Sequence, residues 1–137
     1  MSISAIYENQ RAIALNEFND IITAGSVLRL PSGEALKLRL QLIDDSFLEV
    51  NISVTGRYSY HWERRLIGRT DIYRFDNAPH TAWKAVASYP AHFHNGSDEN
   101  VEASPISRDL AEAIRQVLGF VRRKLYEEQQ KQTPQDV

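Results

Sequence analysis

The sequence has 137 residues, a formal net charge of −2 at pH 7, four histidines and no cysteine. A chain of this length forms one domain with a sizeable core, and its charge argues against nonspecific DNA binding through a uniformly basic surface. The lack of cysteine excludes disulfides, thiolate zinc sites and cysteine nucleophiles. There is no signal-peptide pattern and no apolar run of membrane-spanning length, so we expect a cytoplasmic protein with no membrane partner.

The first element that the sequence predicts is a helix over residues 5–24. Its apolar positions follow a 3.6-residue period, and Gly25 stands where a helix often ends on a left-handed residue. From Val27 the period changes to two, and leucines alternate with polar residues over residues 36–42. The tight-turn sequence Pro31-Ser32-Gly33 between these runs predicts that the first two strands form a hairpin.

Three further strands are predicted from alternation and from the turn residues between them: residues 47–54, 58–62 and 72–76. In the second of these, Tyr58, Tyr60 and Trp62 share one face, whereas Ser59 and His61 share the other. Beyond Pro79 the pattern favours a short helix over residues 81–88, then a last strand or an extended loop over residues 89–94. A turn and a polar loop follow over residues 95–103.

The clearest helix lies in the C-terminal segment, where Ser104-Pro105 or Ser107 offers an N-cap. Its apolar stripe contains Leu110, Ile114, Val117, Leu118, Val121 and Leu125. Residues 129–137 are polar and are predicted to form a disordered tail after a single domain over residues 1–128. The predicted class is α+β, with an N-terminal helix, an antiparallel sheet of about five or six strands, and a long C-terminal helix packed on the sheet.

The chemistry of the chain is concentrated between Tyr58 and His94, a stretch that holds every histidine and both tryptophans. RNA can be cleaved when one group removes the 2′-hydroxyl proton and another protonates the leaving 5′ oxygen, and histidine can do either. An arginine then stabilises the charge on the phosphorane. The candidate catalytic residues are therefore His61, His80, His92 and His94 with Arg74.

Basic and aromatic residues in the same stretch resemble a surface for single-stranded nucleic acid. The candidate substrate-binding residues are Arg57, Tyr58, Tyr60, Trp62, Asp76 and Asn77. The alternative, in which these side chains merely pack and hydrogen-bond within a sheet, stays open. A metal site stays open too, because His92 and His94 would point to one side of an extended segment, with Asp76, His61 or His80 completing it. No specific ligand spacing supports a metal, so we expect no cofactor.

Three motifs together resemble the TumE family, described as toxin components of bacterial and archaeal toxin–antitoxin modules. They are YSYHW at residues 58–62, IYRFDNAPH at residues 72–80 and YPAHFH at residues 89–94, and the strand at residues 46–50 and the final helix resemble the family as well. The resemblance implies a growth-inhibiting toxin with a cognate antitoxin as its protein partner. Thr81 and Ala91 stand where family members commonly have histidines, which argues against metal chelation.

The leading hypothesis is a toxin that acts as a metal-independent ribonuclease on cellular RNA. His61 and His80 would be the acid–base groups, Arg74 the phosphate stabiliser, and His92 and His94 supporting or alternative catalytic groups. A non-catalytic RNA- or protein-binding subunit and a metal-dependent nuclease are the alternatives, and a homodimer is left open.

Overall fold

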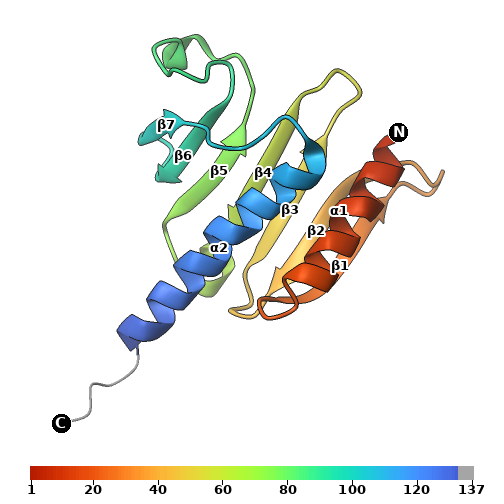
Figure 1. Cartoon of the computed structure of the whole chain (residues 1–137), viewed down its shortest axis with the longest axis horizontal. Coiled ribbons are helices and arrows are strands. Elements are labelled where there is room, and N and C mark those ends of the chain that lie inside the picture. Colours follow the sequence, from red (N-terminus) through yellow and green to blue (C-terminus); the bar gives the residue numbers. More distant parts are fainter. Residues whose placement is uncertain (133–137) are drawn as a thin grey trace.

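The sheet is a single antiparallel meander in which each strand pairs with the next along the chain (Figure 1). The computed structural model describes residues 1–132. Within these residues the sheet has seven strands: β1 (Ile22–Arg29), β2 (Ala35–Leu42), β3 (Phe47–Ile52), β4 (Tyr58–Glu63), β5 (Ile72–Asp76), β6 (His92–Gly96) and β7 (Val101–Ala103). The α+β class is confirmed, but the predicted count of five or six strands was too low, because the segment expected to be a polar loop contains β7.

Two helices, α1 (Ile3–Glu17) and α2 (Leu110–Gln132), lie on the same face of the sheet (Figure 1). The hydroxyl of Ser2 accepts the N–H of Ala5 at 3.1 Å and caps α1. The carboxylate of Asp109 accepts the N–H groups of Ala111 and Glu112 at 3.0 and 3.1 Å. Asp109 therefore caps α2, in place of the serines that the sequence suggested.

The N-terminal helix is shorter than predicted, since it ends at Glu17 and residues 22–24 belong to β1. The carbonyl of Phe18 accepts the N–H groups of Ile21 and Ile22, which turns the chain into the sheet. Gly25 lies inside β1 and does not end a helix. A Cβ there would lie 3.0 Å from a methyl group of Leu40, so glycine permits close packing.

The core lies between the helices and the inner face of the sheet, and alternation along the strands supplies it. Leu38, Leu40 and Leu42 of β2 are buried there with Tyr60 and Trp62 of β4, as the period of two predicts, whereas Leu36 at the start of β2 is exposed. Phe75 and Phe93 stack face to face on β5 and β6, with ring centroids 4.1 Å apart. Phe120 of α2 meets both rings edge-on, which fixes this helix over the last strands.

A buried arginine joins three parts of the fold. The side chain of Arg64 is only 1% exposed, and its guanidinium lies 4.1 Å above the ring of Trp62. It bonds Glu128 of α2 through both terminal nitrogens, at 2.7 and 2.6 Å. It also bonds Asp71 before β5 at 2.9 Å and Asp44 of the β2–β3 turn at 3.3 Å.

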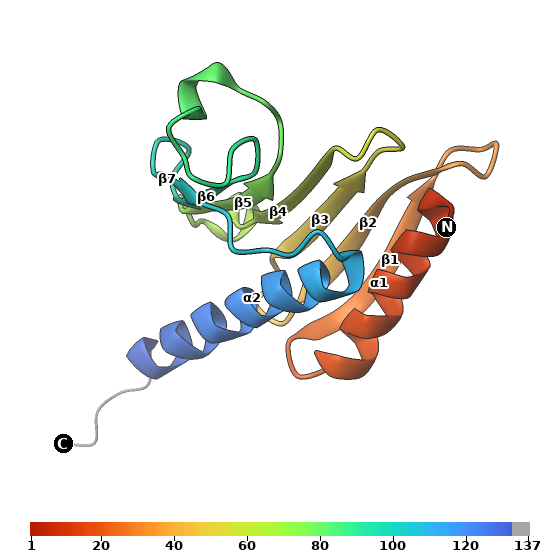
Figure 2. The same cartoon turned by 45° about the horizontal axis from the view of Figure 1, so that its top comes forward.

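The segment after β5 departs most from the prediction. The short helix expected over residues 81–88 is one 3₁₀ turn, η2 (Thr81–Trp83), and β6 starts only at His92. A second 3₁₀ turn, η1 (Arg65–Ile67), follows β4. The loop between β5 and β6 curls above the sheet, away from α2 (Figure 2).

The C-terminal helix extends to Gln132, into the segment predicted as a disordered tail, and residues 133–137 of that tail lie outside the described residues. Most of the apolar stripe predicted for α2 is buried, namely Ile114, Val117, Leu118, Val121 and Leu125, whereas Leu110 is partly buried. Among residues 1–132, neither helix combines the length and the apolar character that a membrane span requires.

Candidate functional site

The outer face of β5 and β6 gathers four polar side chains, which we call the outer-face cluster: Arg74, Asp76, His92 and His94. Strand pairing places Asp76 opposite His92 and Arg74 opposite His94. Since successive side chains of a strand point to opposite faces, the phenylalanines between them face the core. The same strand register therefore builds the core and the cluster.

Asp76 is the centre of this cluster, although its residue exposure is only 8%. One carboxylate oxygen accepts the N–H of Ala78 at 3.1 Å, which is the local bond expected at this corner. The same oxygen lies 3.0 Å from Nε2 of His92. The other oxygen accepts a hydrogen bond from Nε of Arg74 at 3.1 Å and lies 3.7 Å from Nε2 of His94.

Both buried histidine rings are oriented by backbone carbonyls. Nδ1 of His92 donates to the carbonyl of Pro90 at 3.0 Å, and Nδ1 of His94 donates to the carbonyl of Asp98 at 3.0 Å. Burial lowers the pKa of His94, which favours the neutral form of its ring. Its Nε2 is then an acceptor and lies 3.4 Å from the guanidinium of Arg74.

The loop between β5 and β6 covers these histidines. The ring centroid of Trp83 lies 6.4 Å from that of His92 and 6.1 Å from that of His94. The two imidazoles are accordingly 2% and 4% exposed. His80 is exposed and packs beside Trp83 at 5.9 Å, and its Nδ1 accepts the N–H of Ala82. His80, which was predicted to be catalytic, therefore lies at the solvent-exposed edge of the loop that covers His92 and His94.

His61 lies beside the cluster, and its Nε2 contacts Glu63. Its residue position on β4 pairs with Arg74 on β5. Its Nε2 is 3.1 Å from a carboxylate oxygen of Glu63, whereas Nδ1 is buried and has no hydrogen-bond partner among the described residues. Arg65 donates two side-chain bonds to the same carboxylate, and together with His61 it holds the pKa of Glu63 at about 2.

The aromatic residues proposed for substrate binding lie on the other face of the sheet. Tyr60 and Trp62 are each 1% exposed within the core, so they offer no surface on which a base could stack. Tyr58 is half-buried on the same inner face. Asn77 accepts the N–H of Tyr58 and donates to the carbonyl of Gly56, both at 2.9 Å, so its side chain ties the corner after β5 to the β3–β4 turn.

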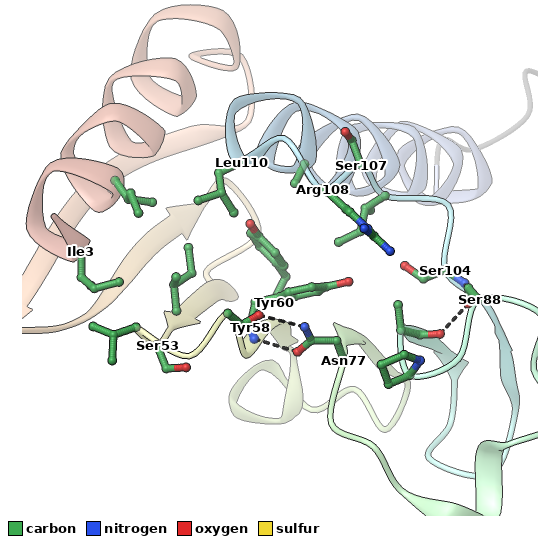
Figure 3. Close-up of a pocket in the computed structure, with 18 of the residues that line it drawn as sticks. Ile3, Ser53, Tyr58, Tyr60, Asn77, Ser88, Ser104, Ser107, Arg108 and Leu110 are labelled. Atoms are coloured by element: carbon green, nitrogen blue, oxygen red, sulfur yellow. Dashed lines mark hydrogen bonds between the residues drawn. The ribbon is translucent and has the colours of Figure 1, made fainter. Parts of the chain in front are cut away.

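Two recesses border this corner. The larger one, of about 1020 Å³, lies on the helix side, and Figure 3 shows Tyr58, Asn77 and Arg108 around it. The smaller one, which we call the outer recess, has a volume of about 540 Å³. Its lining includes Arg57, Ser59, Arg74, Asp76 and Asn77. The outer recess therefore joins Arg57 to Arg74 and Asp76 of the outer-face cluster.

Sequence reasoning singled out the stretch that contains the outer-face cluster but did not predict which of its residues lie together. It put His61 and His80 first, whereas the structure brings His92 and His94 to Asp76. The contributions of Trp83 and Asp98 were missed, because both lie on loops whose course depends on tertiary contacts. One signal in the sequence could have predicted the grouping. Arg74 and Asp76 stand two residues apart, as do His92 and His94, and residues two apart on a strand point to the same face of the sheet.

Comparison with protein families gave a match to the model described as Toxin TumE over residues 11–125. The match includes every residue of the outer-face cluster and most of the described chain. Searches of curated proteins and of solved structures found no significant match. The chain belongs to the TumE toxin family.

Proposed function

We propose that this toxin is a ribonuclease and that it binds the RNA backbone in the outer recess. Family membership makes the chain the toxin component of a toxin–antitoxin module and implies a cognate antitoxin. The observation that carries the ribonuclease proposal is that Arg57 and Arg74 line one recess together with Asp76 of the histidine-containing cluster. A recess with two guanidiniums fits an RNA phosphodiester, because arginine recognises phosphate oxygens in pairs.

The local charge of the recess supports this proposal despite the net charge of −2. Arg57 is exposed on the turn before β4, and no ion pair within the described residues engages it. Arg74 is partly exposed and shares its charge between Asp76 and the exposed Asp98. Binding would therefore rest on a small basic site, with a modest salt dependence.

In the proposed reaction the 2′-oxygen of a ribose attacks the adjacent phosphorus, and the bond from phosphorus to the 5′ oxygen breaks. One group accepts the 2′-hydroxyl proton and another donates a proton to the leaving oxygen. We assign these roles to His61, which Glu63 orients, and to the exposed His80. Arg74 stabilises the phosphorane charge, while His92 and His94 support it, and none of these proton transfers needs a metal ion.

The test is RNA cleavage by the purified toxin, measured together with growth inhibition on expression. His61→Ala and His80→Ala should each reduce cleavage by about 10²-fold or more, while thermal melting stays close to wild type. Arg57→Ala should weaken RNA binding, and Arg29→Ala, at an exposed arginine on β1, is the matched control. Unchanged cleavage by both histidine variants would refute their roles, and RNA binding by wild type without any product would show a binding subunit instead.

A further inference from the structure

The donor atoms of Asp76, His92 and His94 converge on one point. One ligand atom from each of the three lies within 4.8 Å of the others, and all three residues are buried. Asp76 ends β5, and the histidines stand two residues apart on β6, so strand pairing and alternation hold all three on the outer face. Rigid strands rather than loops therefore set the positions of the donors.

The orientation of the rings is the one found around metal ions. Each imidazole donates its Nδ1–H to a backbone carbonyl, that of Pro90 or that of Asp98, and so turns its Nε2 towards Asp76. In protein metal sites the ligating histidine commonly donates its other ring N–H in this way, which fixes the tautomer and the ring plane. Two histidines in one cluster have this arrangement.

Both ring nitrogens of His92 face oxygen atoms. Its Nδ1 faces the Pro90 carbonyl, and its Nε2 lies 3.0 Å from a carboxylate oxygen of Asp76, so both nitrogens face acceptors. A neutral imidazole has one N–H and leaves a lone pair directed at a carboxylate. Either an additional proton or a metal ion resolves this contact.

The distances around Asp76 are compatible with a metal ion. Two ligand atoms bound to one tetrahedral Zn²⁺ at about 2.0–2.2 Å lie roughly 3.3–3.6 Å apart. Nε2 of His92 and Nε2 of His94 lie 3.0 and 3.7 Å from the two oxygens of Asp76, on either side of that range. A single proton on His92 would satisfy only the shorter contact and would leave Nε2 of His94 to Arg74 alone.

We propose that Asp76, His92 and His94 form a binding site for a divalent transition metal of the Zn²⁺ class. Imidazole ligands favour such ions over Mg²⁺ and Ca²⁺, and two histidines with one carboxylate leave a coordination position open, as in catalytic zinc sites. Three protein donors are the usual number in such a site, so Asp76, His92 and His94 suffice without a further ligand. This reverses the expectation of a metal-free site that the sequence favoured.

A variant of Arg74 can distinguish a metal site from a cluster held together by hydrogen bonds alone. Its guanidinium lies against Asp76 and Nε2 of His94, so it is the cation nearest to the proposed metal, and it also reaches Asp98 at 3.3 Å. Removing its charge should therefore leave Zn²⁺ binding intact or tighten it. If the cluster were only a hydrogen-bonded network around this arginine, neither the wild-type chain nor the Arg74 variant would bind Zn²⁺.

The test uses the full chain, stripped of metal by a chelator and titrated with Zn²⁺ in a calorimeter without RNA. We expect one Zn²⁺ per chain and a rise in melting temperature. Asp76→Asn, which preserves side-chain shape, and His92→Ala and His94→Ala should weaken binding by more than about tenfold. His80→Ala is the matched control, because it removes an exposed histidine outside the ligand set, and Arg74→Gln should bind at least as well as wild type.

Absence of Zn²⁺ binding by the wild-type chain would overturn the site, as would binding that the Asp76 and His92 variants leave unchanged. If Arg74→Gln lost as much Zn²⁺ affinity as the variants of Asp76, His92 and His94, the proposed set of ligands would be wrong. Because no RNA is present, the result is separate from the ribonuclease proposal: a toxin that cleaves RNA without binding Zn²⁺ refutes only the metal site. Zn²⁺ binding without cleavage refutes only the ribonuclease.

Discussion

Replacing Arg64 with methionine should lower the free energy of unfolding by about 3 kcal/mol, at the lower end of the range for a broken buried ion pair. Methionine keeps an apolar chain over Trp62 but leaves three carboxylates without the buried guanidinium: Asp44, Asp71 and Glu128. In this variant Arg69 still contacts Asp71 at 3.1 Å and Glu128 at 3.2 Å. The expected loss in unfolding free energy therefore stays below the upper limit of about 5 kcal/mol.

The assay is equilibrium unfolding in urea, followed by tryptophan fluorescence. A loss of this size is a large fraction of the 5–15 kcal/mol typical of a small domain, so the midpoint should move clearly. The matched control is Arg115→Met, at a partly exposed arginine that pairs with Glu17 and Glu112, and its midpoint should stay near wild type. Equal midpoints for the Arg64 and Arg115 variants would refute the reasoning.

Two further predictions concern residues around β4. Ser46→Ala removes the hydroxyl that accepts the indole N–H of Trp62 at 2.8 Å, so the free energy of unfolding should fall by about 1–3 kcal/mol. Adding Trp62→Phe in the Ser46→Ala background should cost less than it does in wild type, and an equal cost would count against the bond. For Glu63, the bond from Arg65 is the main cause of a folded-state pKa near 2, against an ordinary value of 4.5. Its ionised form therefore stabilises the fold fully above pH 4.5, and this contribution disappears as the pH falls towards 2. The difference in unfolding free energy between wild type and Glu63→Gln should be constant near neutral pH and shrink below pH 4.5, and a difference that is unchanged at pH 2 would contradict this.

Strands β2 to β5 were predictable because alternation and turn residues agree at each of them. β5 was predicted with its observed limits, and β4 differs only by the inclusion of Glu63. The N-terminal boundary was not predictable in this way. Phe18, Ile21 and Ile22 are buried whether the chain continues as a helix or turns into a strand, so their spacing does not distinguish the two.

For the candidate site, residue types indicated the stretch but could not indicate the neighbours. A histidine at position 61 and a histidine at position 94 look alike in the sequence. Only the fold shows that one is bonded to Glu63 and the other is directed at Asp76. The sequence predicted that Tyr60 and Trp62 share one face of the sheet. It did not show that the helices cover this face and bury both side chains, because that depends on how distant elements pack together. The course of residues 77–91 depends on packing across the sheet, which local sequence does not specify.

The stacked rings of Phe75 and Phe93 also constrain the opposite side of the sheet. Each ring stands one residue from two members of the outer-face cluster, so a one-residue slip between β5 and β6 would expose a phenylalanine and bury a charged or imidazole side chain. Such a slip would cost free energy on both faces of the sheet, because an apolar ring would be exposed on one face and a polar side chain buried on the other. The buried stack of Phe75 on Phe93 therefore helps to fix the register of β5 and β6. Through this register, aromatic packing on the inner face sets the spacing between the Asp76 carboxylate and the imidazoles of His92 and His94 on the outer face.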